Sequence, residues 1–108
     1  MEHRWGQRSS AALSTRVRHG EPRVLAVGRV VNMSISGALI RTALQADVLS
    51  CLEVQVDRQW IAGAVIYRSR GYVAVEWLDL APTAVVRQLE RTAHQAHQLA
   101  STQALAAA

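Results

Sequence analysis

The segment Val24-Leu25-Ala26-Val27-Gly28-Arg29-Val30-Val31-Asn32-Met33-Ser34-Ile35-Ser36-Gly37 joins an apolar run to a short polar sequence. Residues 23–31 are nearly all apolar and predict a buried strand. Residues 32–37 are rich in Asn, Ser and Gly, which are typical of a chain reversal, and Gly37 lets another group approach the backbone closely. Residues 38–42 then predict a short returning strand. We therefore expect a hairpin whose turn forms a polar binding edge.

Alternation of apolar and polar residues predicts further strands before and after this hairpin. They cover residues 13–18, 52–57, 60–67 and 72–78. Residues 43–49 are too short for more than one helical turn or a crossing loop. Five or six short strands at roughly 10-residue spacing are typical of an antiparallel sandwich or barrel.

The periodicity changes after Asp79, near Pro82. Apolar residues then recur at spacings of three and four, which predicts a helix that packs its stripe on the sheet or across its open end. These residues are Val85, Leu89, Ala93, Ala96 and Leu99 or Ala100. We expect one domain overall, made of a flexible arm at 1–12, a β-barrel at 13–80, a helix at 81–100 and a frayed tail at 101–108.

Composition limits the class of protein. A chain of 108 residues, half of them apolar, is long enough for one domain with one modest core. No window approaches 18 consecutive apolar residues, and the first 20 residues carry four Arg, so neither a membrane span nor a secretory signal is expected. The single cysteine, Cys51, excludes an internal disulfide. A cytoplasmic protein is the expectation.

The positive charge is concentrated near the N-terminus. All 12 basic residues are Arg, and residues 1–29 hold six of them against Glu2 and Glu21, whereas residues 30–108 hold six Arg and six acids. The formal net charge of +4 therefore comes from the first part of the chain, where an anionic partner is expected to bind. Arg4 and Arg8 form an RxxxR pattern in this region.

These residue types suit the binding of a phosphorylated, base-containing ligand. An Arg guanidinium can hold phosphate or guanine in a bidentate manner and can stack on a purine. The Asn32 amide and the Ser34 hydroxyl suit a base edge. No nucleophile paired with a base is evident, so an enzyme is the least expected class. His94 and His97 lack a third ligand nearby, so no metal site is predicted.

The RxxxR of Arg4 and Arg8, followed by the NxSxxG of Asn32, Ser34 and Gly37, resembles the signature of the PilZ domain family. The segments Gly37–Ile40 and Val75–Leu80 also resemble family strands. The resemblance implies a mostly β fold, a six-stranded antiparallel barrel with a C-terminal helix, and cyclic di-GMP as the ligand of these five residues. Further candidate contacts are His3, Ser36, Arg29, Arg70 and Trp77.

The leading interpretation is a bacterial, single-domain cyclic di-GMP receptor or adaptor whose conformational change signals to an unidentified effector protein. Motility and biofilm formation are among the outputs that such a receptor would serve. It would need no cofactor or metal, and would be a monomer or weak dimer. Two alternatives stay open: a PilZ-like protein-interaction module that binds no nucleotide, and a small barrel that binds single-stranded nucleic acid. A barrel that binds single-stranded nucleic acid needs several exposed aromatic residues on adjacent strands for stacking. This chain has no Phe and only five aromatic residues in total, so nucleic acid is disfavoured as a partner.

Overall fold

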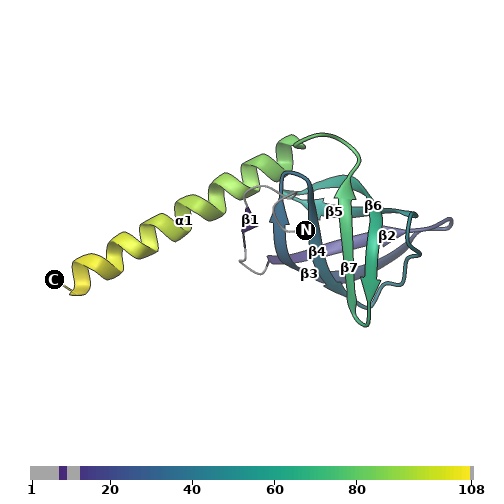
Figure 1. Cartoon of the computed structure of the whole chain (residues 1–108), viewed down its shortest axis with the longest axis horizontal. Coiled ribbons are helices and arrows are strands. Elements are labelled where there is room, and N and C mark those ends of the chain that lie inside the picture. The colour runs from purple at the N-terminus through teal and green to yellow at the C-terminus, as the bar shows by residue number, and fades with distance from the viewer. Residues whose placement is uncertain (1–7, 10–12, 108) are drawn as a thin grey trace.

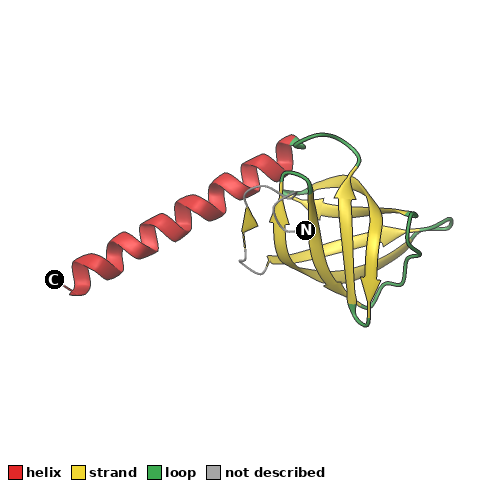
Figure 2. Cartoon of the chain, viewed as in Figure 1, coloured by secondary structure: helices red, strands yellow, loops and turns green. Residues whose placement is uncertain are grey.

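The computed structural model describes the backbone of Arg8–Ser9 and of residues 13–107, and the side chains from Leu13 to Ser101. These described residues form seven strands followed by one helix (Figures 1 and 2). The strands are β1 (Arg8–Ser9), β2 (Leu13–His19), β3 (Val24–Ser34), β4 (Gly37–Thr42), β5 (Cys51–Val56), β6 (Gln59–Ser69) and β7 (Tyr72–Trp77). The helix, α1, spans Thr83–Ala107.

Six strands close into an antiparallel barrel, as predicted. Their order is β3-β2-β5-β6-β7-β4, and β4 pairs again with β3 to complete the ring. The 11-residue β3 makes this possible because its first part pairs with β2 and its second part pairs with β4. Residues 43–50 cross between β4 and β5 as a loop, and β1 adds to the far end of β3.

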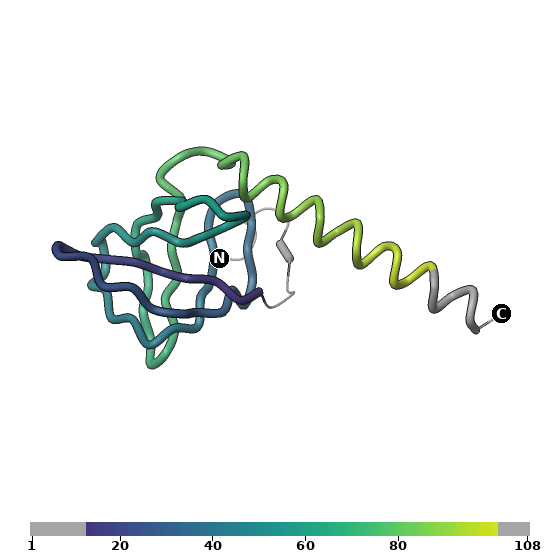
Figure 3. Tube along the Cα trace, turned by 180° about the vertical axis from the view of Figure 1, so that it is seen from behind, coloured from purple at the N-terminus to yellow at the C-terminus, as the bar shows by residue number. Residues whose placement is uncertain are grey.

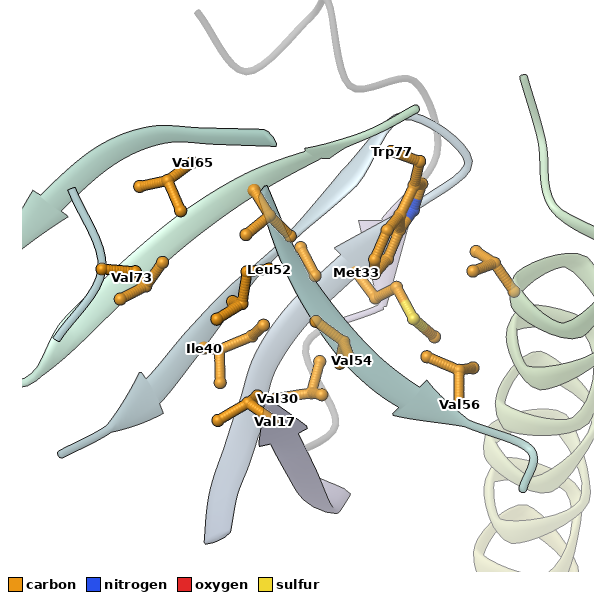
Figure 4. Close-up of a cluster of buried hydrophobic side chains, with 14 of the residues drawn as sticks. Val17, Val30, Met33, Ile40, Leu52, Val54, Val56, Val65, Val73 and Trp77 are labelled. Atoms are coloured by element: carbon orange, nitrogen blue, oxygen red, sulfur yellow. The ribbon is translucent and has the colours of Figure 1, made fainter. Parts of the chain in front are cut away.

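The core lies inside the barrel and comes from alternate residues of every barrel strand (Figure 4). Val17, Ile40, Leu52, Val65 and Val75 are completely buried. β-branched side chains suit this position because they pack well on a pleated surface. The helix closes one end of the core, where Ala84 and Val85 are also buried.

The helix differs from its prediction in both length and packing. It begins at Thr83 rather than residue 81 and continues to Ala107, because no Gly or Pro interrupts an Ala- and Gln-rich sequence of high helix propensity. The frayed tail expected from residue 101 is therefore helical backbone through Ala107. Within this helix, no stretch of the described residues is long and apolar enough to cross a bilayer.

Within the part of α1 whose burial the structure describes, only the first turns pack on the barrel (Figure 3). Leu89 is partly buried against the core, and Arg91 Nη2 donates to Asp57 Oδ1 at 3.0 Å. Beyond this ion pair, every side chain from Ala93 to Ser101 is exposed, and the molecule measures 55 × 25 × 24 Å. The prediction that the apolar stripe packs on the sheet or across its open end holds for Val85 and Leu89. It was wrong for Ala93 and the stripe residues after it, since a straight helix leaves the small barrel after about three turns.

An ion pair on the outer face joins β2 to β5. Arg18 Nε donates to Glu53 Oε1 at 2.8 Å and Arg18 Nη2 donates to Oε2 at 3.3 Å, while the guanidinium lies 4.0 Å from the Trp60 ring centroid. The hydrogen bond from Arg18 holds the pKa of Glu53 below its ordinary value of 4.5, against the opposing effect of burial. Trp60 therefore packs under an arginine of the barrel itself.

Glu53→Gln is expected to lower stability by less than about 1 kcal/mol at pH 7, since the pair is partly solvated. A carboxylate whose pKa is lower in the folded than in the unfolded state stabilises the fold at pH values above its unfolded-state pKa. This contribution disappears as the pH falls through its folded-state pKa. The stability difference between wild type and Glu53→Gln, from urea unfolding, should therefore shrink below pH 4.5. A difference that stays constant from neutral to strongly acidic pH would contradict this account.

Candidate functional site

The polar turn between β3 and β4 is held by hydrogen bonds of its own residues. The Ser36 backbone N–H donates to Ser34 Oγ at 3.1 Å, a local bond that serine commonly makes in turns. Ser34 is completely buried. Its hydroxyl oxygen therefore shapes the turn, and its predicted contact with a base edge stays a prediction.

Trp77, at the end of β7, anchors the same turn from the other side (Figure 4). Its indole Nε1–H donates to the Ser34 carbonyl oxygen at 3.1 Å, and its backbone N–H donates to the Ser36 carbonyl oxygen at 2.8 Å. The side chain is 6% exposed. Trp77, one of the further candidate contacts, thus supports the turn from the core.

Gly37 begins β4 directly against the backbone of β7. A Cβ at this position would collide with the Val75 carbonyl oxygen and would lie 3.1 Å from Glu76 Cα. The sequence predicted that a group would approach the Gly37 backbone closely, and that group is a neighbouring strand. The glycine of the NxSxxG pattern is therefore required by the barrel itself, whatever the turn binds.

Asn32 is turned outward by an irregularity in β3. The pairing of β3 with β4 shifts by one residue between Val30 and Asn32, so Val30 and Met33 both lie in the core. The Asn32 Oδ1 atom is buried, and among the residues that the structure describes no hydrogen-bond donor reaches it. Because buried polar atoms nearly always have partners, this acceptor suits a donor that a ligand would supply.

The short strand β1 brings part of the N-terminal arm to this turn. Arg8 pairs with Ser34 and Ser9 pairs with Met33, both antiparallel. The backbone of the second RxxxR arginine therefore lies beside the central serine of the NxSxxG pattern. Arg4 and His3 lie outside the described residues.

A basic groove lies on the outer face of β2, β3 and β4. Arg29 and Arg41 are direct cross-strand partners, and Arg16 lies on the neighbouring strand beside the same hollow of about 670 Å³. Like charges placed opposite each other are unfavourable, and in the described part of the chain none of these three forms an ion pair. The groove is therefore suited to an anion.

Sequence reasoning identified Arg29 but missed Arg41. The signal that could have identified Arg41 was its position in the strand that starts at Gly37. Residues 39 and 41 share one face of that strand, because side chains alternate between its two faces. Leu39, on the same face as Arg41, is the pairing partner of Asn32. Arg41 therefore follows Asn32 along the outer face of the hairpin.

Arg70 lies in the loop between β6 and β7, at the opposite end of β7 from the turn (Figure 1). It lines a separate hollow with residues 42–46. The structure thus brings together Arg8, Asn32, Ser34, Ser36 and Gly37, places Arg29 on the adjoining face, and leaves Arg70 elsewhere. Within residues 13–101, no three metal-binding side chains cluster.

About three quarters of the chain resembles a known structure. It superposes on the crystal structure of the PilZ domain of CeSA from a cellulose-synthesizing bacterium with a TM-score of 0.62. The sequences are 15% identical, and the match covers 77% of this chain and 94% of the other. No protein-family model matches the sequence. No curated protein matches it either. The chain therefore has the fold of a PilZ domain, a six-stranded antiparallel β-barrel with one C-terminal helix.

Proposed function

We propose that this protein is a cyclic di-GMP receptor that acts as a binding module and not as an enzyme. The observation that carries the proposal is the pairing of Arg8 with Ser34, which joins the two separated sequence motifs at one place on the barrel. The PilZ fold supports the same interpretation.

Each part of the site has a chemical role in this proposal. Arg4 and Arg8 hold the phosphates or stack on the guanines, because a guanidinium combines a fixed charge with a planar face. The buried Asn32 Oδ1 atom of the side-chain amide accepts a hydrogen bond from a guanine N–H, which gives this acceptor a partner. Arg29 and Arg41 add attraction for the phosphates along the basic groove.

The alternative of single-stranded nucleic acid has less support. Trp77 is buried and offers no face for stacking bases, and Arg18 already occupies one face of the Trp60 ring. Among the aromatic side chains that the structure describes, Tyr67 and Tyr72 are the exposed ones. A PilZ-like interaction module without nucleotide is the outcome left if the binding test below fails.

Calorimetric titration of cyclic di-GMP tests the proposal, with GTP as the ligand control. Losing hydrogen bonds to a charged group typically costs about 1.5–3 kcal/mol, so Arg8→Ala should weaken binding by about 10- to 100-fold. Asn32→Ala should weaken it by about tenfold. Arg23→Ala is the matched control, because it removes the same charge at the other end of β3.

Binding of cyclic di-GMP but not GTP, weakened by Arg8→Ala and Asn32→Ala and unchanged by Arg23→Ala, supports the receptor. Binding at the basic groove would show as a further loss in Arg41→Ala and a steeper decline with salt. The absence of both heat and a thermal shift at saturating nucleotide would refute the receptor proposal.

A further inference from the structure

A second hollow, of about 410 Å³, lies next to the polar turn, between the turn and the segment that leads into α1. We name it the turn groove. Its floor includes the buried Val75 and Trp77, and its rim carries the exposed Ile35, Leu78 and Leu80, which are 41%, 59% and 93% exposed. Three large exposed aliphatic side chains around one hollow are typical of a binding surface.

The turn groove is also acidic, in a protein with an excess of arginine. Glu76 and Asp79 line it, and both are exposed. In the described part of the chain neither has an ion-pair partner, whereas Asp47, Glu53 and Asp57 each contact an arginine. A segment that complements the groove therefore carries a large apolar anchor and an adjacent positive charge.

The chain contains such a segment, and its attachment point lies beside the groove. Arg4-Trp5-Gly6-Gln7 directly precedes Arg8. Because Arg8 pairs antiparallel with Ser34, a chain extended backward from Arg8 runs in the direction of Ile35 and Ser36, which line the groove. Three residues span about 10 Å, so Trp5 can reach the hollow.

We propose that the turn groove is the docking site of the chain's own N-terminal segment, with the Trp5 ring among Ile35, Leu78 and Leu80 and the Arg4 guanidinium facing Glu76 and Asp79. A tethered segment has an effective concentration in the millimolar range, which favours it over an untethered partner of similar chemistry. Trp is suited to this role because it buries a large area at low entropic cost.

One consequence rests on the proposed function. If cyclic di-GMP is held by Arg4, binding withdraws Arg4 and Trp5 from the turn groove. The rim formed by Ile35, Leu78 and Leu80 then becomes accessible, which gives the nucleotide a surface through which to signal.

Methyl NMR of the full chain, labelled at Ile, Leu and Val, tests docking without any nucleotide. The Trp5 ring shifts nearby methyl resonances, so Trp5→Ala should move those of Ile35, Leu78 and Leu80. The methyl groups of Leu52, in the core, and Leu25, on the far part of β3, should stay in place. Gln7→Ala is the control within the same segment and should leave all of these resonances unchanged.

The charge contribution is tested by Glu76→Lys combined with Asp79→Lys. This variant should move the three rim resonances toward their positions in Trp5→Ala, with Leu52 again reporting an intact core. Rim resonances that are the same in wild type and Trp5→Ala would overturn the proposal. Shifts that disappear on dilution would also overturn it, because they would assign the groove to a second copy.

Adding cyclic di-GMP separates this proposal from the proposed function. If the nucleotide releases Arg4 and Trp5 from the turn groove, the rim resonances of the wild type should move to their positions in Trp5→Ala as the protein becomes saturated with nucleotide. If Trp5→Ala shifts the rim resonances but the nucleotide does not bind, docking is established and the receptor proposal fails. If the nucleotide binds but Trp5→Ala leaves the rim resonances unchanged, docking fails and the receptor proposal stands.

Discussion

Trp77→Ala is expected to lower the free energy of unfolding by about 3–5 kcal/mol. The substitution empties a site beside Met33 at the end of the core that holds the turn (Figure 4), and it removes the donor of the Trp77 Nε1 to Ser34 O hydrogen bond. Because 5–15 kcal/mol is the usual total for a domain, this loss is a large share of the stability. Urea unfolding followed by far-UV circular dichroism measures it.

Trp77→Phe separates the packing from the hydrogen bond. The phenyl ring keeps much of the volume of the indole, but it leaves the buried Ser34 carbonyl oxygen without its indole donor. Loss of this hydrogen bond should lower the free energy of unfolding by about 1–3 kcal/mol. A Phe variant as stable as wild type would show that the indole bond does not hold the turn. Trp60→Phe is the matched control, because Trp60 is partly exposed and no hydrogen bond from its indole is found among the described residues.

Gly37→Ala is expected to destabilise the barrel by about 3 kcal/mol. The added methyl group collides with the Val75 carbonyl oxygen and presses on the Glu76 backbone, so β4 and β7 must separate where they pair. Backbone cannot move aside as a flexible side chain would. Thermal and urea unfolding of the purified variant provide the measurement.

Gly71→Ala is the matched control for this substitution. Gly71 has a φ of +79° and nothing within 4 Å of its added Cβ, so alanine there meets backbone strain of about 1 kcal/mol without a collision. If Gly37→Ala proved no less stable than Gly71→Ala, the close approach of β7 would not be the reason for glycine at position 37.

The strands could be predicted from the sequence because their side chains alternate between core and solvent. Residues 52–57, for example, correspond closely to β5, in which Leu52, Val54 and Val56 are buried. The helix was predicted less well. Ala93 and Ala96 continue the apolar stripe of Val85 and Leu89, but spacing alone cannot show that the barrel ends before the helix does.

The candidate site shows a similar division. The NxSxxG pattern identified the turn, yet the roles of its residues depend on segments distant in sequence. Ser34 and Gly37 are held against β7, about 40 residues later, and Arg41 joins Arg29 only through strand pairing. None of these partners is visible in a local window of sequence.

The sequence by itself determined the period-two strands, the change to a helical period after Pro82, the N-terminal excess of arginine and the motif at the turn. These are local properties, set by side-chain size, charge and backbone preference. The tertiary structure alone decided that β3 pairs with β1, β2 and β4, so that Arg8 meets Ser34 and an acidic, apolar groove forms beside them. Closing a barrel brings distant residues together because every strand must satisfy its backbone hydrogen bonds on both edges.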